Sequence, residues 1–182
     1  TAVTEAARAF VHRHPPAVPC IAEYGAEFPQ FLAQRVGPEQ IPYLSSFVEL
    51  EWHLGHAAVA IDHPALAIDA FATIEADALV DLRLTLQPSL RYCAAAWPVD
   101  NLITLYLSEA PPEHYAFEPS DVHLEICGAR GEFRIERLDV ASFTFRKALS
   151  ECQTVGIVAE QAIERDATFD AGRALAAFVV GR

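Results

Sequence analysis

The sequence predicts an α+β fold, with a helical N-terminal half and a smaller C-terminal half that combines a β-hairpin with helices. Apolar residues in the first 75 positions recur mainly at steps of three and four, the period of an amphipathic helix. From residue 80 the period changes to two, which is typical of a strand with one buried face. The 182 residues are 52% hydrophobic, enough for one core or two small ones. We therefore expect a helical domain over residues 1–75 and an α+β domain over residues 76–182.

The first half is expected to form helices that end at proline and glycine residues. Thr4 is a suitable N-cap for the first helix, and the prolines at positions 15 and 16 end it because proline cannot continue a helix. The longest helix is expected over residues 42–61, where Leu44 and Phe47 begin an apolar stripe. The expected helices span residues 4–12, 19–24, 26–36, 42–61 and 65–74.

The second half begins with alternating apolar positions. Four aliphatic side chains in residues 80–86 alternate with polar ones, which predicts a half-buried strand. A second strand is expected over residues 90–96. Residues 101–107 are apolar and fit either a strand or a helix, and residues 110–120 contain three prolines and are expected to form a loop.

A β-hairpin is expected over residues 121–137. Apolar side chains alternate on both arms, and Gly128 and Gly131 mark the turn. Asp139 and Thr154 are suitable N-caps for the helices that follow. These helices are expected over residues 139–152, 154–165 and 169–180. A hairpin beside two or three helices is a winged-helix-like arrangement.

The charge of the chain disfavours nucleic acid as a partner. The formal net charge is -12, from 25 acidic and 13 basic residues, and Lys147 is the single lysine in the sequence. Proteins that grip phosphates concentrate lysine and arginine. A basic peptide would suit this charge better.

The four cysteines fit a cytoplasmic protein better than a secreted one. They are far apart and form no C-x-x-C pair, so we expect buried, reduced thiols and no zinc site. The cysteines are Cys20, Cys93, Cys127 and Cys152. The sequence has no uncharged run of about 18 apolar residues, so we expect no membrane span. Because Met is absent, we expect residue 1 to follow the native start.

Three polar side chains of the longest expected helix share one stripe. Glu49, His53 and His56 are spaced four and three residues apart, which places them on one helical face. A carboxylate with two imidazoles suits iron or zinc. The H-E-x-x-H pattern is missing and no further ligand can be named, so we interpret the stripe as a polar, partner-facing surface.

The remaining polar candidates have structural interpretations. Glu51 fits an ion pair with an arginine of another helix, whereas His12, His14 and His123 are expected at the surface. The sequence contains no nucleophile elbow, phosphate-binding loop or dinucleotide motif. Nothing therefore predicts a bound cofactor.

The hairpin is a candidate peptide-binding element, because an exposed strand edge can accept an extended peptide through backbone hydrogen bonds. The alternative is an ordinary wing that packs on the C-terminal helices. The candidate peptide-contacting residues are Val122, His123, Leu124, Glu125, Ile126, Phe133, Arg134 and Ile135.

Several segments together resemble one bacterial family. They are residues 7–16, 24–32, 42–52, 86–89, 97–98 and 169–170. In this order they resemble the HvfC/BufC family, whose N-terminal region has been labelled a DNA-binding domain and which is distantly related to MbnC of methanobactin biosynthesis. The resemblance covers nearly the whole chain.

The resemblance implies a non-catalytic partner protein without a cofactor of its own. Such a protein forms a heterodimer with a multinuclear non-haem iron enzyme and presents a precursor peptide, whose cysteines the enzyme converts into copper-binding groups. The α+β half would hold the leader peptide, the helical half would contact the enzyme, and the iron ligands would belong to the enzyme. The expected enzyme-interface residues are Tyr43, Glu49, Trp52, His53 and His56.

Two other functions remain open at this point. The winged-helix-like order and the family label allow a DNA-binding regulator, which the charge of -12 disfavours. A metalloenzyme would use Glu49, His53 and His56.

Overall fold

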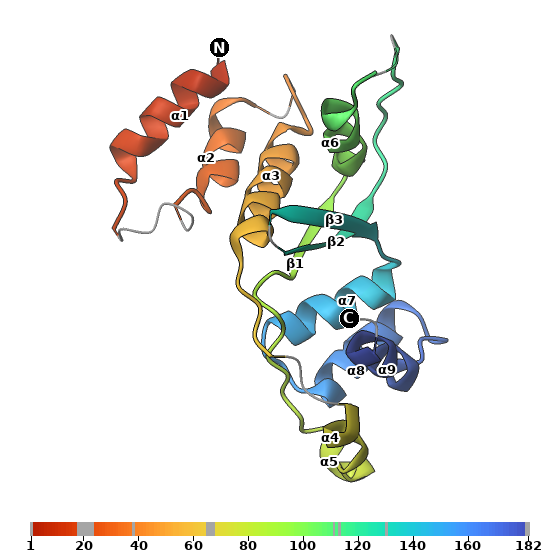
Figure 1. The fold of residues 1–182 in the computed structure, drawn as a ribbon. Helices are drawn as coiled ribbons and strands as arrows, with labels where there is room; N and C mark the ends of the chain where they lie inside the picture. Colours follow the sequence, from red (N-terminus) through yellow and green to blue (C-terminus); the bar gives the residue numbers. More distant parts are fainter. Residues whose placement is uncertain are drawn as a thin grey trace.

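The computed structural model describes residues 2–17, 24–37, 39–64, 68–110, 112, 114–129 and 131–180. It has an α+β fold, in which N-terminal helices precede an antiparallel sheet and further helices, so the predicted fold class is confirmed (Figure 1). The helices are α1 (Ala2–Arg13), α2 (Phe28–Arg35), α3 (Leu44–Val59), α4 (Ile68–Ala72), α5 (Ala76–Leu79), α6 (Val99–Leu107), α7 (Val140–Ser150), α8 (Val155–Arg165) and α9 (Ala171–Val180). The strands are β1 (Arg91–Ala95), β2 (Val122–Ala129) and β3 (Glu132–Arg137).

The sheet has the strand order β1-β2-β3, so β2 is the central strand. Both pairs are antiparallel, and Leu124 of β2 lies between Cys93 of β1 and Arg137 of β3. The sheet is placed between α3 on one side and α7 on the other (Figure 1). The long connection through α6 lets β1 and β2 pair although they are far apart in sequence.

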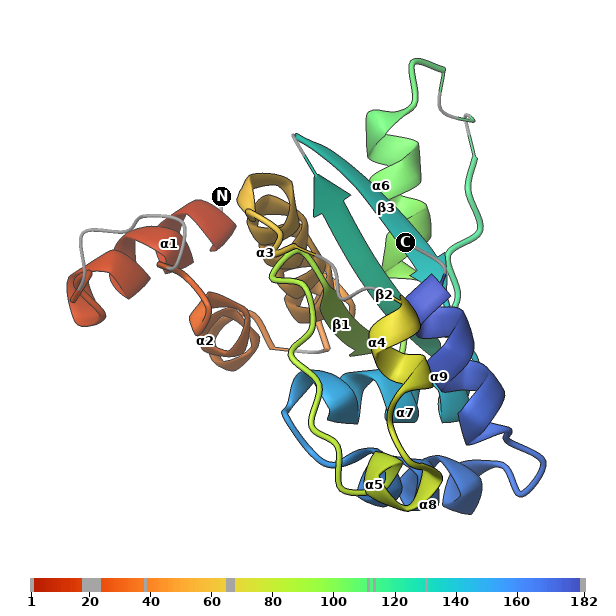
Figure 2. The ribbon, with the colours of Figure 1, turned by 60° about the horizontal axis from the view of Figure 1, so that its bottom comes forward.

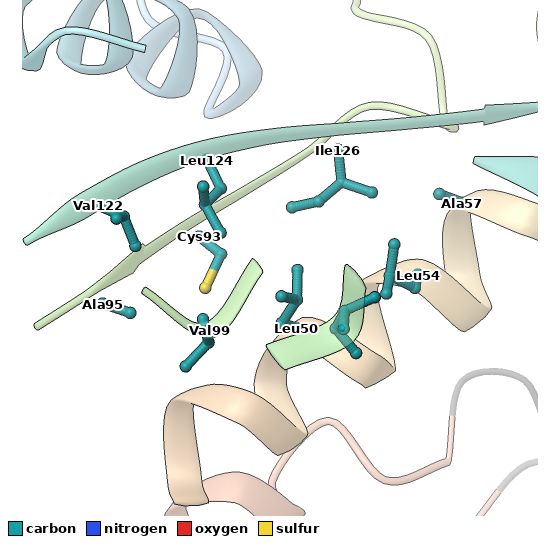
Figure 3. Packing of buried hydrophobic residues seen from close by; sticks show 10 residues of the cluster. Leu50, Leu54, Ala57, Cys93, Ala95, Val99, Val122, Leu124 and Ile126 are labelled. Carbon is teal, nitrogen blue, oxygen red and sulfur yellow. The ribbon is translucent and has the colours of Figure 1, made fainter. Parts of the chain in front are cut away.

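The main core lies between α3 and the sheet. Leu50, Leu54 and Ala57 of α3 pack against β1, β2 and α6 (Figure 3). Leu124 and Ile126 of β2 contribute fully buried side chains to the same cluster. The core therefore crosses residue 75, the predicted boundary between the two halves.

A second core joins α7, α8 and α9. Phe145, Leu149 and Val158 are fully buried there. Leu82, Leu84 and Leu86 pack against this cluster, as their alternation with polar residues predicts. The alternation therefore predicted correctly which side chains of residues 82–86 face the core.

The predicted strand over residues 80–86 is nevertheless wrong. α5 ends at Leu79, and the following segment forms only an isolated bridge, between Arg83 and Thr154. Its carbonyl groups accept hydrogen bonds from the first turn of α8 instead, with N···O distances of 2.9 Å from Val155 to Leu82 and 2.8 Å from Gly156 to Val80. The first N–H groups of a helix have no partner within the helix, so this extended segment satisfies them.

The hairpin is confirmed, but its turn is shorter than predicted. β2 runs to Ala129 and β3 starts at Glu132, and Gly131 has a φ of 88°, a left-handed conformation that glycine adopts without strain. Residues 101–107, whose sequence fits either a strand or a helix, belong to α6.

The predicted N-cap of α7 is also confirmed. The Asp139 Oδ1 atom accepts a hydrogen bond of 2.8 Å from the Ser142 N–H, which satisfies one donor in the first turn of α7.

α1 and α2 lie on the side of α3 that faces away from the sheet (Figures 1 and 2). Ala6 of α1 and Leu32 of α2 form a third buried cluster, against which Leu44 and Val48 of α3 pack. The predicted helix over residues 19–24 lies largely outside the described residues. In the part of the chain that the structure describes, no helix is long and apolar enough to cross a membrane.

Candidate functional site

The two arms of the hairpin differ in what they expose. β2 is paired on both sides, whereas β3 is paired on one side only. Among the described residues, no backbone hydrogen bond reaches β3 from its outer side. Every side chain of β3 except that of Ile135 is exposed. The outer edge of β3 is therefore the part of the hairpin that can accept an added strand.

Three of the predicted peptide contacts have their side chains in the core. Val122, Leu124 and Ile126 are 3%, 0% and 0% exposed, and they point toward α3 (Figure 3). These side chains cannot contact a docked peptide in this structure. The prediction that they contact a peptide is therefore wrong for their side chains, which hold the central strand in place.

Glu125, which was predicted to contact a peptide, is a buried acid with two partners. It is 1% exposed. Its Oε2 atom accepts hydrogen bonds from the Tyr92 hydroxyl at 2.9 Å and from Arg146 Nη1 at 3.0 Å. Arg146 belongs to α7, so this ion pair links α7 to the second face of the sheet. Buried charges are retained when they are paired in this way.

His123 and Ile135 are half-buried rather than exposed. The His123 ring lies 4.9 Å from the Phe143 ring of α7. Ile135 packs against the main core from the edge strand. The prediction that His123 is a surface residue is thus only partly correct, because α7 covers its face of β2.

Phe133 and Arg134 are the predicted peptide contacts that remain accessible. Phe133 is 39% exposed. Arg134 Nη2 lies 3.6 Å from Glu136 Oε2 along the same face of β3, and both side chains are largely exposed. At the far end, Arg137 anchors β3 to α6 through two hydrogen bonds to Asp100, of 2.7 and 2.9 Å.

A pocket of about 330 Å³ lies at the beginning of β3. Cys127 of β2 faces Arg134 in this pocket, and a hydrogen bond between the two side chains is the largest cause of a raised pKa of the Arg134 guanidinium. Gly128 lies beside α3, since an added Cβ would be 2.6 Å from the Ala57 carbonyl oxygen. The lining residues are Asp62, Ser89, Cys127, Gly128, Glu132, Phe133 and Arg134.

The predicted enzyme-interface residues form two groups. Trp52, His53 and His56 are neighbours on α3, with the Trp52 ring 5.3 Å from that of His53 and 4.1 Å from that of His56. Glu49 lies next to them, because its Oε1 atom is 3.8 Å from His53 Nε2. Tyr43 lies apart, at the start of α3.

Tyr43 belongs to an aromatic cluster that the sequence did not predict. Its ring lies 5.8 Å from Trp97 and 4.8 Å from Phe117, and Trp97 stacks on Phe117 at 5.2 Å. Tyr115 extends the cluster to the surface, with its ring 6.1 Å from that of Phe117. The segment after α6 is thereby held against the N-terminal end of α3.

Two of the three candidate metal ligands on α3 are close enough to interact. Glu49 and His53 approach each other. Within the described residues, no group of three or more His, Cys, Asp or Glu side chains is arranged to hold a metal ion. α3 thus does not assemble the three-ligand site that a metalloenzyme using Glu49, His53 and His56 would need.

The cysteines do not share one environment. Burial, with a smaller contribution from Glu49, raises the pKa of the Cys93 thiol to about 12, so this thiol is inert at neutral pH. Cys127 is half-buried and Cys152 is exposed, and all three are free thiols. The expectation of buried thiols is therefore wrong for Cys152, and Cys20 lies outside the described residues.

Neither a protein-family model nor a curated protein matches this chain. The family resemblance seen in the sequence therefore remains a prediction.

Proposed function

We propose that this chain is a non-catalytic partner protein that binds a precursor peptide and presents it to a multinuclear non-haem iron enzyme. The peptide's leader segment pairs with the outer edge of β3, and the enzyme modifies cysteines farther along the peptide. The observation that supports this proposal most is the unpaired, exposed edge of β3 on a sheet whose other two strands are largely buried. The family resemblance supports the same assignment.

The side chains of β3 define what kind of peptide would fit. Because successive side chains point to opposite faces, Arg134 and Glu136 flank a docked strand on one face and Phe133 flanks it on the other. The guanidinium and carboxylate suit charged or polar peptide residues, whereas Phe133 suits an apolar one. The net charge of -12 favours a peptide with basic residues.

The enzyme would contact α3 through its polar stripe. Glu49, Trp52, His53 and His56 are half-buried. Trp is one of the residues enriched in protein interfaces, so Trp52 is the strongest contact candidate in this stripe. The iron is expected in the enzyme, and the heterodimer is expected in the cytoplasm, which agrees with free thiols at Cys93, Cys127 and Cys152.

Co-purification tests the enzyme part of the proposal. A tagged chain should retain a multinuclear non-haem iron enzyme of this class on co-expression, and Trp52→Ala with His53→Ala should weaken retention. The matched control is Glu160→Ala on the exposed side of α8, which should retain the enzyme as well as the unchanged chain. Absence of binding to both the enzyme and its precursor peptide would contradict the proposal.

A gel-shift assay at low salt tests the competing function in DNA binding. Contacts to phosphates give an affinity that falls steeply with salt. We expect no shift. A salt-dependent shift at micromolar protein would favour a DNA-binding regulator instead.

A further inference from the structure

A second pocket, of about 370 Å³, lies between α1, residues 24–28 and α3. This volume is at the lower end of the roughly 300–1,000 Å³ that small-molecule sites occupy. Four aromatic residues line it, and they come from each of the three segments. They are Phe10, Tyr24, Phe28 and Trp52.

The rings on the α1 side support one another. Phe10 is 5% exposed, and its ring lies 5.6 Å from that of Tyr24 and 5.3 Å from that of Phe28. Rings held in this way form a rigid wall. The face of an aromatic ring carries partial negative charge and attracts cations, most strongly when several rings surround one cation.

Two polar groups in this pocket are not used by the fold. Trp52 Nε1 is buried and has no hydrogen-bond partner among the described residues. Gly25 lies beside the indole N–H, since a Cβ added there would be in van der Waals contact with this nitrogen at 3.8 Å. Glu51 also lines the pocket. It is an exposed residue, yet partial burial of its carboxyl raises the pKa.

These groups select a cation over other ligands. An anion would be repelled by Glu51, and a purely apolar ligand would bury part of that carboxylate without a partner. A compact ammonium group with alkyl substituents contacts the rings through its methyl groups and pairs with Glu51 through its charge. An oxygen atom near the ammonium can accept a hydrogen bond from the Trp52 Nε1–H.

We propose that the pocket between α1 and α3 binds an alkylated ammonium group, with the four aromatic rings around the cation, Glu51 as its counter-charge and Trp52 Nε1–H as a hydrogen-bond donor to a neighbouring oxygen. Choline supplies both the ammonium group and a nearby hydroxyl oxygen, whereas the trimethyllysine side chain supplies the ammonium group alone. The site is separate from β3, because α1 and α2 lie on the side of α3 that faces away from the sheet (Figures 1 and 2). The proposal is therefore independent of peptide docking on β3, although the pocket shares Trp52 with the proposed enzyme interface.

A titration observed through the indole N–H groups tests the proposal. The chain has two tryptophans, so a ¹⁵N-labelled sample gives two indole signals, and Trp97→Phe assigns them. Choline should shift the Trp52 signal in a saturable way and leave the Trp97 signal in place. The neutral isostere 3,3-dimethylbutan-1-ol has the same shape without the charge, and it should bind about tenfold more weakly.

Matched variants separate the pocket from the overall charge. Glu51→Gln should weaken choline about fivefold and leave the neutral isostere unaffected. Glu160→Gln removes the same charge from the exposed side of α8, outside the pocket lining, and should change neither affinity. Trimethyllysine amide is titrated in parallel. Tighter binding of this amide would assign the ammonium group to a partner's side chain, whereas tighter binding of choline would assign it to a free small molecule.

Three results would overturn the proposal. They are an unmoved Trp52 signal at saturating choline, equal affinities for choline and its neutral isostere, and equal weakening of choline by the two glutamate variants.

Discussion

β2 and β3 are arms of the same hairpin, and both alternate apolar with polar residues, but their environments are opposite. Glu125 of β2 pairs in register with Glu136 of β3, so the two glutamates lie on the same face of the sheet. Glu125 is 1% exposed and bonded to Arg146, whereas Glu136 is exposed. Glu125 lies on the central strand under α7 and supports the fold, whereas Glu136 lies on the edge strand, where it is exposed and pairs with Arg134 at 3.6 Å.

The largest expected effect is on the core face of β2. Leu124→Ala should lower the free energy of unfolding by about 4 kcal/mol, because it leaves a cavity in the main core. Phe133→Ala on β3 is the matched truncation and should cost less than about 1.5 kcal/mol, since Phe133 is 39% exposed. Urea unfolding measures both. Equal losses would contradict the difference between the two arms.

The buried ion pair should give the next largest effect. Arg146→Met removes the cationic partner of the buried Glu125 carboxylate, so we expect a loss of about 3 kcal/mol. Combining it with Glu125→Gln should recover part of that loss, as a double-mutant cycle would show. Glu136→Gln is the control on β3 and should change stability by less than about 0.5 kcal/mol.

Asp139 links the hairpin to α7 and should have a smaller, pH-dependent effect. Asp139→Ala removes the N-cap of α7 and should cost about 1 kcal/mol at pH 7. Burial raises the pKa of the Asp139 carboxyl, but hydrogen bonds from Ser142 outweigh this and keep the pKa below its ordinary value.

The sign of this pH dependence follows from the lowered pKa. A carboxyl whose folded pKa lies below its unfolded value stabilises the fold above about pH 4, and the contribution is lost as the pH falls through the folded pKa. Asp139→Asn keeps most of the cap but cannot titrate, so the difference from the unchanged chain should shrink on acidification. A difference that grows at low pH would contradict the assignment.

The smallest effect is expected on the exposed face of β3. Arg134→Ala should change the free energy of unfolding by less than about 0.5 kcal/mol, because its pair with Glu136 is solvent-exposed at 3.6 Å. The same change should weaken binding of the precursor peptide. A large loss of stability with unchanged peptide affinity would reverse the roles that we assign to the two strands.

Local sequence patterns predicted elements well where short-range chemistry decides them. The N-cap at Asp139, the turn glycine at position 131 and the alternating strands of the hairpin were all predicted from a few neighbouring residues. Residues 80–86 show the limit of this approach. Their leucines are buried as predicted, but their backbone bonds with the start of α8, which no local pattern reveals.

The burial and pairing of the candidate site residues depend on contacts between residues that are far apart in the sequence. The alternation of Val122, His123, Leu124 and Glu125 predicts one buried and one exposed face. α7 covers the second face as well, so Glu125 is buried with an arginine 21 residues away. An acid flanked by aliphatic residues on a strand, with an arginine on a following helix, was the signal in the sequence that could have indicated this pair. The aromatic pocket between α1 and α3 likewise combines residues from three separate segments.

Hydrogen exchange of the sheet amides tests the central claim most directly. In the free protein, we expect the β2 amides to exchange slowly and alternate β3 amides, which point away from β2, to exchange quickly. Addition of the precursor's leader peptide should slow those β3 amides and leave the β1 amides unchanged, because the peptide pairs with the outer edge of β3. Protection that develops on β1, or no change on β3 when the peptide is bound, would contradict the account.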